Sequence, residues 1–563
     1  MAFERPWHRH YAPGVPAEVA IDPVTMPVLL ERTAARHPQH PAFIYFGRRI
    51  TFAALLDLVH RFAQALAKLG VEPGDKVSMI LPNIPQMVIA NHAAHRLGAV
   101  TAMHNPLYTE RELTQQIADA GSRVAVVLDL LLPRIERIRP QTALETVVTC
   151  GIRDFLPFPQ KQFFPLVRRQ MYRRIKPGPG LYRFEDLIAR QPAVALPVAA
   201  RWEDPAALLF TGGTTGVSKG AVLTHANISG VVQQFTAWFP DLKPTEESIM
   251  GIYPIFHSAG YSVSQNLPIA NAWTCVLVPR PEPSVIIDLL AKYRPTFLPG
   301  VPTIFVGLLN DPRFAGMDLS FVKGYFAGAA PLAPDTVARL ETLHGATIHD
   351  VYGATEDTAF ATCAPYKGRI KPGTAGLPLP NTDIRIVDAE TGDRVLAAGE
   401  VGEICIRGPQ VMQGYYRRPE ETAAALRDGW FYLGDLGFLD EEGYLTVVDR
   451  KKDMIVAGGY NIYPTEVDAI LMEHPGIMEA CTFGVPDAYR GETVKCCVVP
   501  MAGSQLEEDE VIAFCRKRLA AYKVPRQVVV VPELPKSAVG KILRREVRRM
   551  DQQAAQDQDT GGR

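Results

Sequence analysis

The ten residues TGGTTGVSKG, Thr211 to Gly220, combine the groups that bind phosphate. Glycines let backbone N–H groups approach a phosphate closely, the hydroxyls add hydrogen-bond donors, and Lys219 adds a positive charge. An ordinary Gly/Thr surface turn is the alternative, but it does not account for four hydroxyls and a lysine in one short loop. The segment therefore predicts a phosphate-binding loop.

This loop differs from a Walker A motif, which reads G-x-x-x-x-G-K-[ST]. Counting from Gly213, Ser218 stands where that motif has its second glycine, and Gly220 follows the lysine in place of serine or threonine. An apolar run precedes the loop, a second one, 221–223, follows it, and a helical pattern begins only after Thr224. We therefore expect a strand, a loop and a second strand, and not the loop-to-helix junction of a P-loop kinase.

A second segment suited to a nucleotide is DVYGATE, Asp350 to Glu356. Tyr352 offers an aromatic ring for a base, Gly353 allows close approach, and Thr355 adds a hydroxyl. A carboxylate near phosphates makes sense only with a cation between them, so Glu356 is a candidate Mg²⁺ ligand.

Two more segments place small or acidic residues at predicted strand ends. Gly328, Ala329 and Ala330 would let a ligand lie flat against the backbone, although a tight strand–helix connection favours the same residues. Asp435, which follows Gly434, accepts hydrogen bonds only and suits two hydroxyl donors. An aspartate after a glycine is also common in simple turns.

The composition limits the class of protein. A chain of 563 residues is too long for one core, so two or more domains are expected. A net charge of −1 without a basic stripe gives no argument for nucleic acid. Eight scattered cysteines without a C-x-x-C pair indicate buried thiols in a reducing compartment. The N-terminus does not read as a secretory signal, and no apolar run approaches the ~20 residues of a spanning helix. We expect a cytoplasmic protein, at most peripheral at the inner face of the membrane.

The segments around these residues alternate between helix and strand patterns. From Thr51, a candidate helix cap, apolar residues recur at helical spacing to Leu66. Strands are predicted over 76–81, 99–102 and 124–128, and helices over 86–97 and 110–120. This alternation indicates a parallel sheet covered by helices. A β-rich pattern follows over 383–449, and helices and strands alternate again between 464 and 531.

Residues 153–176 interrupt the alternation. Four phenylalanines and seven basic residues stand here against one acidic residue, Asp154. The segment is either a surface insertion with a solvated basic face, or a peripheral anchor to anionic lipid with aromatic rings at the headgroup boundary. Both interpretations remain open from the sequence.

Taken in order, these motifs resemble the adenylate-forming superfamily of acyl-CoA synthetases, nonribosomal adenylation domains and beetle luciferases. The loop is similar to its phosphate-binding signature, with Gly213 where serine is usual, and DVYGATE resembles its YGxTE motif. Further similar segments are PIFH (254–257), GWFYLGD (429–435), DRKKDMI (449–455) and PKSAVGK (535–541). The resemblance covers roughly 23–549 and is strongest to bacterial long-chain fatty-acyl-CoA synthetases.

The resemblance implies a role for each candidate residue. Lys541 would bridge the substrate carboxylate and the α-phosphate, and Lys219, His257 and Thr355 complete the implied catalytic set. The implied nucleotide and coenzyme A contacts are Thr211, Gly212, Gly213, Thr214, Thr215, Gly216, Gly328, Ala329, Ala330, Asp350, Tyr352 (stacking on adenine), Gly353, Asp435 (on the ribose hydroxyls), Arg450, Lys452 (at a hinge), Gly458, Gly459 and Tyr460. His257, Tyr261 and Ala354 would line the acyl pocket, and Glu356 would hold Mg²⁺.

The expected protein is thus an ATP-, Mg²⁺- and coenzyme A-dependent ligase for a long-chain fatty acid, of α/β fold. We expect an AMP-binding domain over 1–449 with a β-rich subdomain over 383–449, a mobile α+β lid over 450–550, and a disordered tail over 551–563. Medium-chain, branched or aromatic acids stay open as substrates, because Ala354 replaces a common Leu or Met and Ser258–Tyr261 does not map to a chain length. A carrier-loading enzyme, a luciferase-like monooxygenase and a non-catalytic lipid-binding scaffold are the rival functions. Dimers are common among relatives.

Overall fold

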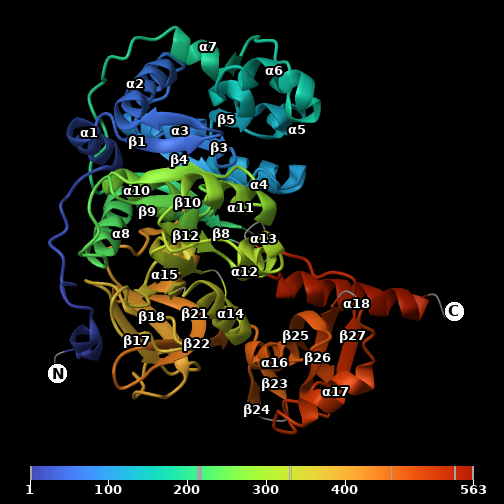
Figure 1. The fold of residues 1–563 in the computed structure, drawn as a ribbon. Coiled ribbons are helices and arrows are strands. Elements are labelled where there is room, and N and C mark those ends of the chain that lie inside the picture. The colour runs from blue at the N-terminus through green and yellow to red at the C-terminus, as the bar shows by residue number, and fades with distance from the viewer. Residues whose placement is uncertain are drawn as a thin grey trace.

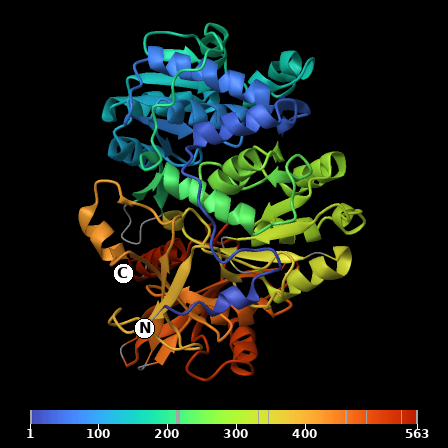
Figure 2. The ribbon, with the colours of Figure 1, turned by 90° about the vertical axis from the view of Figure 1, so that its left-hand side faces the viewer.

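Four β-sheets with helices around them make up the described part of the chain, which confirms the predicted mixed α/β class. The computed structural model describes residues 3–211, 218–328, 330, 332–345, 347–457, 460–487, 489–501, 503–537 and 540–560, the last six without side chains. The helices between residues 52 and 189 lie at one end of the molecule and the C-terminal sheet lies at the other (Figures 1 and 2).

An eight-stranded sheet carries the strands on either side of the predicted phosphate loop. Its order is β19 (Gly414–Tyr415), β9 (Lys219–Thr224), β8 (Pro205–Thr211), β4 (Val100–Met103), β3 (Lys76–Ile80), β5 (Val124–Leu128), β6 (Thr146–Cys150) and β7 (Leu181–Arg183). The strands from β8 to β7 run parallel. Their near-continuous burial is typical of a sheet covered on both faces.

Helices and strands in this part of the chain agree with the predicted order. The helices are α1 (Met26–Arg36), α2 (Phe52–Lys68), α3 (Pro85–Arg96), α4 (Glu110–Ala120), α5 (Leu132–Ile138), α6 (Gln160–Val167) and α7 (Phe184–Ala189). The Thr51 side chain accepts a hydrogen bond from the Ala54 N–H, which confirms the predicted cap of α2. One stripe of α2, including Phe52, Val59 and Phe62, is buried, as the helical spacing predicts.

A nine-stranded sheet carries the DVYGATE segment. Its order is β16 (Leu377–Pro378), β15 (Thr362–Cys363), β14 (Ile348–Tyr352), β13 (Gly324–Ala327), β12 (Phe297–Gly300), β10 (Ser248–Gly251), β11 (Thr274–Leu277), β1 (Pro41–Tyr45) and β2 (Arg48–Thr51). The helices between its strands are α8 (His225–Ala237), α9 (Ser258–Gly260), α10 (Leu267–Ala270), α11 (Pro283–Tyr293), α12 (Pro302–Leu309), α13 (Pro312–Ala315) and α14 (Pro334–His344), and a π-helix (Tyr261–Asn266) joins α9 to α10. One continuous apolar core joins this sheet to the eight-stranded one.

The segment predicted to be β-rich forms a five-stranded antiparallel sheet. It contains β17 (Asp383–Val387), β18 (Gly402–Arg407), β21 (Trp430–Leu439), β20 (Leu426–Arg427) and β22 (Leu445–Arg450), and α15 (Pro419–Ala425) precedes β20. The N-terminal 3-10 helix η1 (Pro6–His10) lies close to this sheet, far from α1 (Figure 1). Two guanidinium groups, those of Arg5 and Arg407, hydrogen-bond the Asp383 carboxylate and hold the N-terminus there.

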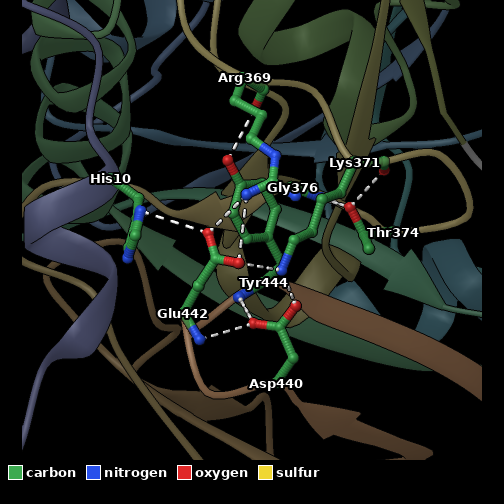
Figure 3. Close-up of polar contacts among 8 residues, drawn as sticks. All are labelled: His10, Arg369, Lys371, Thr374, Gly376, Asp440, Glu442 and Tyr444. Carbon is green, nitrogen blue, oxygen red and sulfur yellow. Dashed lines mark hydrogen bonds and ion pairs between the residues drawn. The ribbon is translucent and has the colours of Figure 1, made fainter.

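The Gly- and Pro-rich joint 370–380, which lies before β17 in the chain, is fixed by a polar network (Figure 3). The Glu442 carboxylate forms ion pairs with Lys371 at 2.8 Å and with Arg369 at 3.0 Å. His10 Nδ1 lies 3.4 Å from Glu442 Oε2. The Tyr444 hydroxyl donates to the Arg369 carbonyl at 2.6 Å. The joint is therefore tied both to the β21–β22 turn and to η1.

The C-terminal part forms its own five-stranded sheet with three helices, as the α+β pattern predicts. Its elements are β23 (Ile455–Ala457), β24 (Tyr460–Ile462), α16 (Pro464–Met472), β25 (Ile477–Asp487), β26 (Gly491–Pro500), α17 (Glu508–Arg516), β27 (Gln527–Val530) and α18 (Arg544–Thr560). Helix α18 runs into 551–560, where the polar composition predicts disorder. Val547 is buried, and Lys495 of β26 pairs with Asp551 at 2.6 Å, so contacts that composition does not reveal hold the helix.

Two expectations about the whole chain concern cysteines and membrane spans. All eight cysteines are buried and unpaired, as expected for reduced thiols. Among the described residues, no helix has the length and apolar character needed to cross a bilayer.

Candidate active site

The predicted phosphate loop connects two antiparallel strands, as expected. β8 ends at Thr211, β9 begins at Lys219, and these two residues are partners in the strand register. Ser218 Oγ donates to the Thr211 carbonyl at 2.7 Å and accepts from Gln116 Nε2 at 3.1 Å, which closes the base of the loop. The loop residues Gly212, Gly213, Thr214, Thr215 and Gly216 lie outside the described residues.

Tyr415 joins the loop lysine to the candidate metal ligand. Lys219 Nζ lies 5.0 Å from the centre of the Tyr415 ring, and the Tyr415 hydroxyl donates to Glu356 Oε1 at 2.7 Å. Pairing of Tyr415 with Ala221 holds β19 beside β9. Burial raises the pKa of Glu356, so a cation bound beside this carboxylate would relieve the cost of its charge. Tyr415 is not among the residues predicted from the sequence, because it lies 59 residues from Glu356. Its only local signal is the sequence Gly-Tyr-Tyr.

Tyr352, Asp435 and Arg450 lie together on neighbouring sheets. The Tyr352 hydroxyl donates to Asp435 Oδ2 at 2.8 Å, and Arg450 Nε lies 3.3 Å from Asp435 Oδ1. Asp435 on β21 and Arg450 on β22 are register partners, so the antiparallel pairing places them side by side. The structure thus brings an aromatic ring, a carboxylate and a cation to one point, and their contacts with a nucleotide stay a prediction.

The turn after Tyr352 is shaped by Asp357, which the sequence analysis also did not identify. Asp357 is fully buried, and its Oδ1 accepts from the Ala354 N–H at 2.8 Å. A Cβ on Gly353 would lie 2.4 Å from the Ala359 backbone, so only glycine fits there. Burial raises the pKa of Asp350 to about 6.

The structure describes two of the three small residues that follow β13. Gly328 is buried, and a Cβ added to it would lie 3.0 Å from the Val351 side chain. Ala330 is half-buried, and Ala329 lies outside the described residues. Close packing of β13 on β14 therefore explains the glycine, and the predicted ligand contact stays a prediction.

His257 and Thr355 come from different segments but border the same site. Ser258 Oγ, next to His257, lies 3.4 Å from Thr355 Oγ1. His257 Nδ1 accepts from the Ala259 N–H at 3.4 Å. Burial, together with the positive charge of Lys541, lowers the pKa of His257 to about 4, so the imidazole is neutral at pH 7.

The other two predicted pocket residues differ in position. Tyr261 is fully buried in the core, and its hydroxyl lies 3.3 Å from His95 Nε2. Ala354 is half-buried in the turn that Asp357 shapes. The position of Tyr261 is that of a packed core residue, and its part in an acyl pocket stays a prediction.

Lys541 reaches the same site from the C-terminal end of the chain. Its side chain is exposed to solvent, but the protein around it partly desolvates the ammonium group. This desolvation, with the positive charge of Arg450, lowers the pKa of Lys541 to about 8. Asp435 acts in the opposite direction on the same pKa. Lys541 is therefore near enough to Arg450, Asp435 and His257 for their charges and its own to act on one another.

The turn that presents Lys541 sits directly on α12. Ser537 N–H donates to the Lys541 carbonyl at 2.7 Å, and the Lys541 N–H donates to Ser537 Oγ at 3.2 Å. Gly540 has a φ of 75°, and a Cβ there would lie 2.4 Å from Thr303 Oγ1. A side chain at this position would push the lysine away, which accounts for the glycine before it.

Arg544 ties this turn to three carboxylates. Its guanidinium lies 2.9 Å from Asp468 Oδ2, 3.4 Å from Asp453 Oδ2 and 3.5 Å from Asp449 Oδ1. Asp468 belongs to α16, Asp453 to the segment between β22 and β23, and Asp449 to β22. The Arg544 side chain therefore holds the start of α18 against the predicted hinge. Nothing near Arg544 in the sequence marks these three partners.

The remaining predicted residues lie around the hinge. Lys452 lies between β22 and β23, and desolvation of its ammonium group lowers its pKa. The exposed ring of Tyr460 stacks on Tyr522, with ring centres 4.5 Å apart. Gly458 and Gly459 lie outside the described residues.

Comparison with known proteins agrees with this arrangement. Residues 30–416 match the model of the AMP-binding enzyme family, and residues 466–541 match that of the AMP-binding enzyme C-terminal domain. The chain therefore belongs to the AMP-binding enzyme family.

Relatives extend over almost the entire chain. It is 39% identical over 548 residues to a long-chain-fatty-acid–CoA ligase of Bacillus subtilis (strain 168), covering 97% of this chain and 98% of that protein. It is similar to the crystal structure of ATP-bound MatB from Rhodopseudomonas palustris, with a TM-score of 0.83, 30% identity and coverage of 94% and 99%. It is also similar to the anthranilate CoA ligase AuaEII in complex with anthranoyl-AMP, with a TM-score of 0.84, 25% identity and coverage of 94% and 98%.

Proposed function

We propose that this protein joins a long-chain fatty acid to coenzyme A in an ATP-dependent reaction that releases AMP and pyrophosphate. The observation that carries the proposal is the cluster of Tyr352, Asp435 and Arg450, which come from distant parts of the chain, with Lys541 near enough for its charge to interact with it. The relative of Bacillus subtilis, named for this activity and aligned over nearly the full length, supports the choice of substrate.

The first half-reaction makes the inert carboxylate reactive. One carboxylate oxygen attacks the α-phosphorus of ATP, pyrophosphate leaves, and the acid becomes an acyl-adenylate with AMP as a good leaving group. Negative charge builds up on the α-phosphate in the transition state, and the positively charged Lys541 stabilises this charge more than that of the ground state. Lys219, at the base of the predicted phosphate loop, supplies a second cation for the phosphates.

The nucleotide is bound by the cluster of Tyr352, Asp435 and Arg450. In the proposed arrangement Tyr352 stacks on adenine, Asp435 accepts from the ribose hydroxyls, and Arg450 reaches the phosphates. The hydrogen bond between Tyr352 and Asp435 would fix the ring relative to the ribose site.

Glu356 fits the role of an Mg²⁺ ligand. It is a hard oxygen donor, its pKa is raised by burial, and the Tyr415 hydroxyl orients it. A bound Mg²⁺ would neutralise charge on the phosphates, while Tyr415 keeps the carboxylate and Lys219 in position.

The second half-reaction requires a different arrangement of the C-terminal part. The coenzyme A sulfur attacks the acyl carbonyl, AMP leaves with the bonding electron pair, and the thiol proton is released. The turn that carries Lys541 packs on α12, so we infer that the part after 449 rotates about Lys452 to withdraw Lys541 and admit the thiol. The domains 1–449 and 450–550 are the moving units in this proposal.

ATP–pyrophosphate exchange across a panel of carboxylic acids tests the proposed function. Long-chain fatty acids should give the fastest exchange, and medium-chain, branched or aromatic acids should be slower. ADP as a product, or no exchange with any acid, would refute adenylation and leave a lipid-binding scaffold. Acceptance of the acyl group by a carrier protein in place of coenzyme A would indicate a carrier-loading enzyme.

We further infer that residues 153–176 contact the membrane surface at its periphery. The supporting observation is the exposure of Phe158, Phe163 and Leu166 next to exposed arginines. Co-sedimentation with anionic vesicles tests this contact, and binding that survives charge reversal of the arginines would rule it out. A homodimer remains a prediction that light scattering would check.

A further inference from the structure

A cavity of about 430 Å³ lies at the edge of the eight-stranded sheet opposite to the phosphate-loop strands. Its walls come from the ends of β5 and β6, from β7, and from the loop 172–177. The lining residues with ionisable side chains are Asp129, Arg153, Asp154, Tyr172, Arg173, Arg174, Lys176, Arg183 and Glu185. None of them belongs to the site described above.

Positive charge dominates this cavity. Glu185 is already paired with Lys161 and with Arg183, the latter at 3.2 Å. By contrast, Arg173, Arg174 and Lys176 have no ion pair or side-chain hydrogen bond within the described residues. These three neighbouring cations thus form no ion pair in the described part of the chain, although the charge of Arg173 acts on the Asp129 carboxyl.

Two further carboxyl groups, those of Asp129 and Asp154, lie in the wall of the cavity. Asp129 is 5% exposed, and its Oδ1 has no hydrogen-bond partner although it lines the cavity. Burial raises the pKa of Asp129 to about 6 and that of Asp154 to about 7. A buried polar atom without a hydrogen-bond partner indicates a site for a ligand or a water molecule. Guanidinium and ammonium donors around one space are complementary to the oxygens of a phosphate group.

An exposed apolar segment adjoins this cavity. Phe158, Leu166 and Val167, in and beside α6, are 82%, 78% and 73% exposed. Lys161 of the same helix donates to the Asp154 carbonyl at 3.0 Å and so attaches α6 to the cavity wall. The helix lies at the outer edge of the molecule (Figure 1). Exposed apolar side chains next to a basic surface are typical of contact with the headgroup region of a membrane.

We propose that this cavity binds the phosphate group of a membrane phospholipid while the apolar side chains of the α6 segment enter the headgroup boundary. The proposal rests on the peripheral membrane contact inferred above and adds to it a defined binding site. The arginines at 173 and 174 hold the phosphate, and those at 168 and 169, outside the cavity, contribute only general surface charge.

Vesicle binding by matched charge reversals tests the proposal. The full-length protein is sedimented with vesicles of phosphatidylglycerol diluted into phosphatidylcholine, comparing Arg173→Glu/Arg174→Glu with the control Arg168→Glu/Arg169→Glu. Both variants carry the same change of charge in the same exposed segment. The cavity variant should bind about tenfold or more weakly than wild type, with a clearly smaller loss in the control. Equal losses in the two variants would overturn the phosphate site and leave only a non-specific basic surface.

Titration of the wild-type protein with inorganic phosphate in the absence of vesicles separates the two parts of the proposal. Phosphate binding that the cavity variant loses, with unchanged vesicle binding, would support the phosphate site and overturn its assignment to a lipid. Absence of binding to both phosphate and vesicles would overturn the proposal entirely. Ligase activity without vesicles should be the same in both variants, so failure of the catalytic proposal would appear separately.

Discussion

Replacing Arg544 by methionine should weaken the attachment of the C-terminal sheet and slow adenylate formation. Methionine retains much of the side-chain volume but removes the cation that faces Asp449, Asp453 and Asp468. Removal of one member of a buried ion pair typically costs about 3–5 kcal/mol. Asp449 also accepts the Arg450 and Thr465 N–H groups at 2.7 Å, which limits its loss, so we expect about 3 kcal/mol.

The cost should depend on pH because of Asp468. Burial raises the pKa of this residue to about 6, even though Arg544 opposes the shift. Without Arg544 the pKa rises further, and ionising the carboxylate in the folded state costs more as the pH increases. The loss of stability should therefore be smaller at about pH 5, where Asp468 is largely protonated in both proteins, than at about pH 8.

Hydrogen exchange of peptides from β25 and β26 measures this loss, because unfolding of so large a chain need not be two-state. The matched control is Arg549→Met, which removes an exposed pair with Glu546 on the same helix and should cost less than about 1 kcal/mol. The rate of pyrophosphate release should fall with Arg544→Met and not with the control. Equal protection of β25 and β26 in both variants would refute the view that Arg544 clamps α18 to the hinge.

Three further predictions concern Lys541 and Tyr415. Lys541→Ala should abolish adenylate formation but leave thioester formation from supplied acyl-adenylate largely intact, and equal loss of both half-reactions would contradict domain rotation. The adenylation rate should fall as the pH rises through about 8, because Lys541 then loses its proton, whereas the thioester half-reaction should lack this limb. A shared limb in both pH–rate profiles would argue against Lys541 as its source. Tyr415→Phe removes the donor to Glu356 but keeps the ring at Lys219, so pyrophosphate exchange at limiting Mg²⁺ should fall about tenfold, as expected for losing a hydrogen bond to a charged group. Unchanged exchange at every Mg²⁺ concentration would show that the hydroxyl does not orient the carboxylate.

Local patterns in the sequence predicted most of the fold. The apolar spacing from Thr51 to Leu66 and the alternating runs up to Leu128 correspond to observed helices and strands, because one face or both faces of each element are buried. The strand–loop–strand arrangement around Lys219 followed from the short apolar run after the loop. These features depend on residues close together in the chain.

Contacts between distant segments could not be predicted in this way. Tyr415 meets Glu356 only because β19 pairs with β9, and Arg544 meets its three carboxylates only when α16 and β22 are in place. Asp357 looks like part of an acidic turn until its burial is known. The helix extends through 551–560, and its contacts include the ion pair of Asp551 with Lys495 of β26 and the burial of Val547. A polar composition reveals neither contact.

The buried position of all eight cysteines has a practical consequence for following catalysis. Burial raises the pKa of every one of these thiols, and the thiolate is the reactive form. A colorimetric disulfide reagent added to the folded enzyme should therefore react with the free thiol of unconsumed coenzyme A and leave the polypeptide unmodified. Turnover can thus be recorded as the disappearance of a chromophore-forming thiol, without removing the protein first.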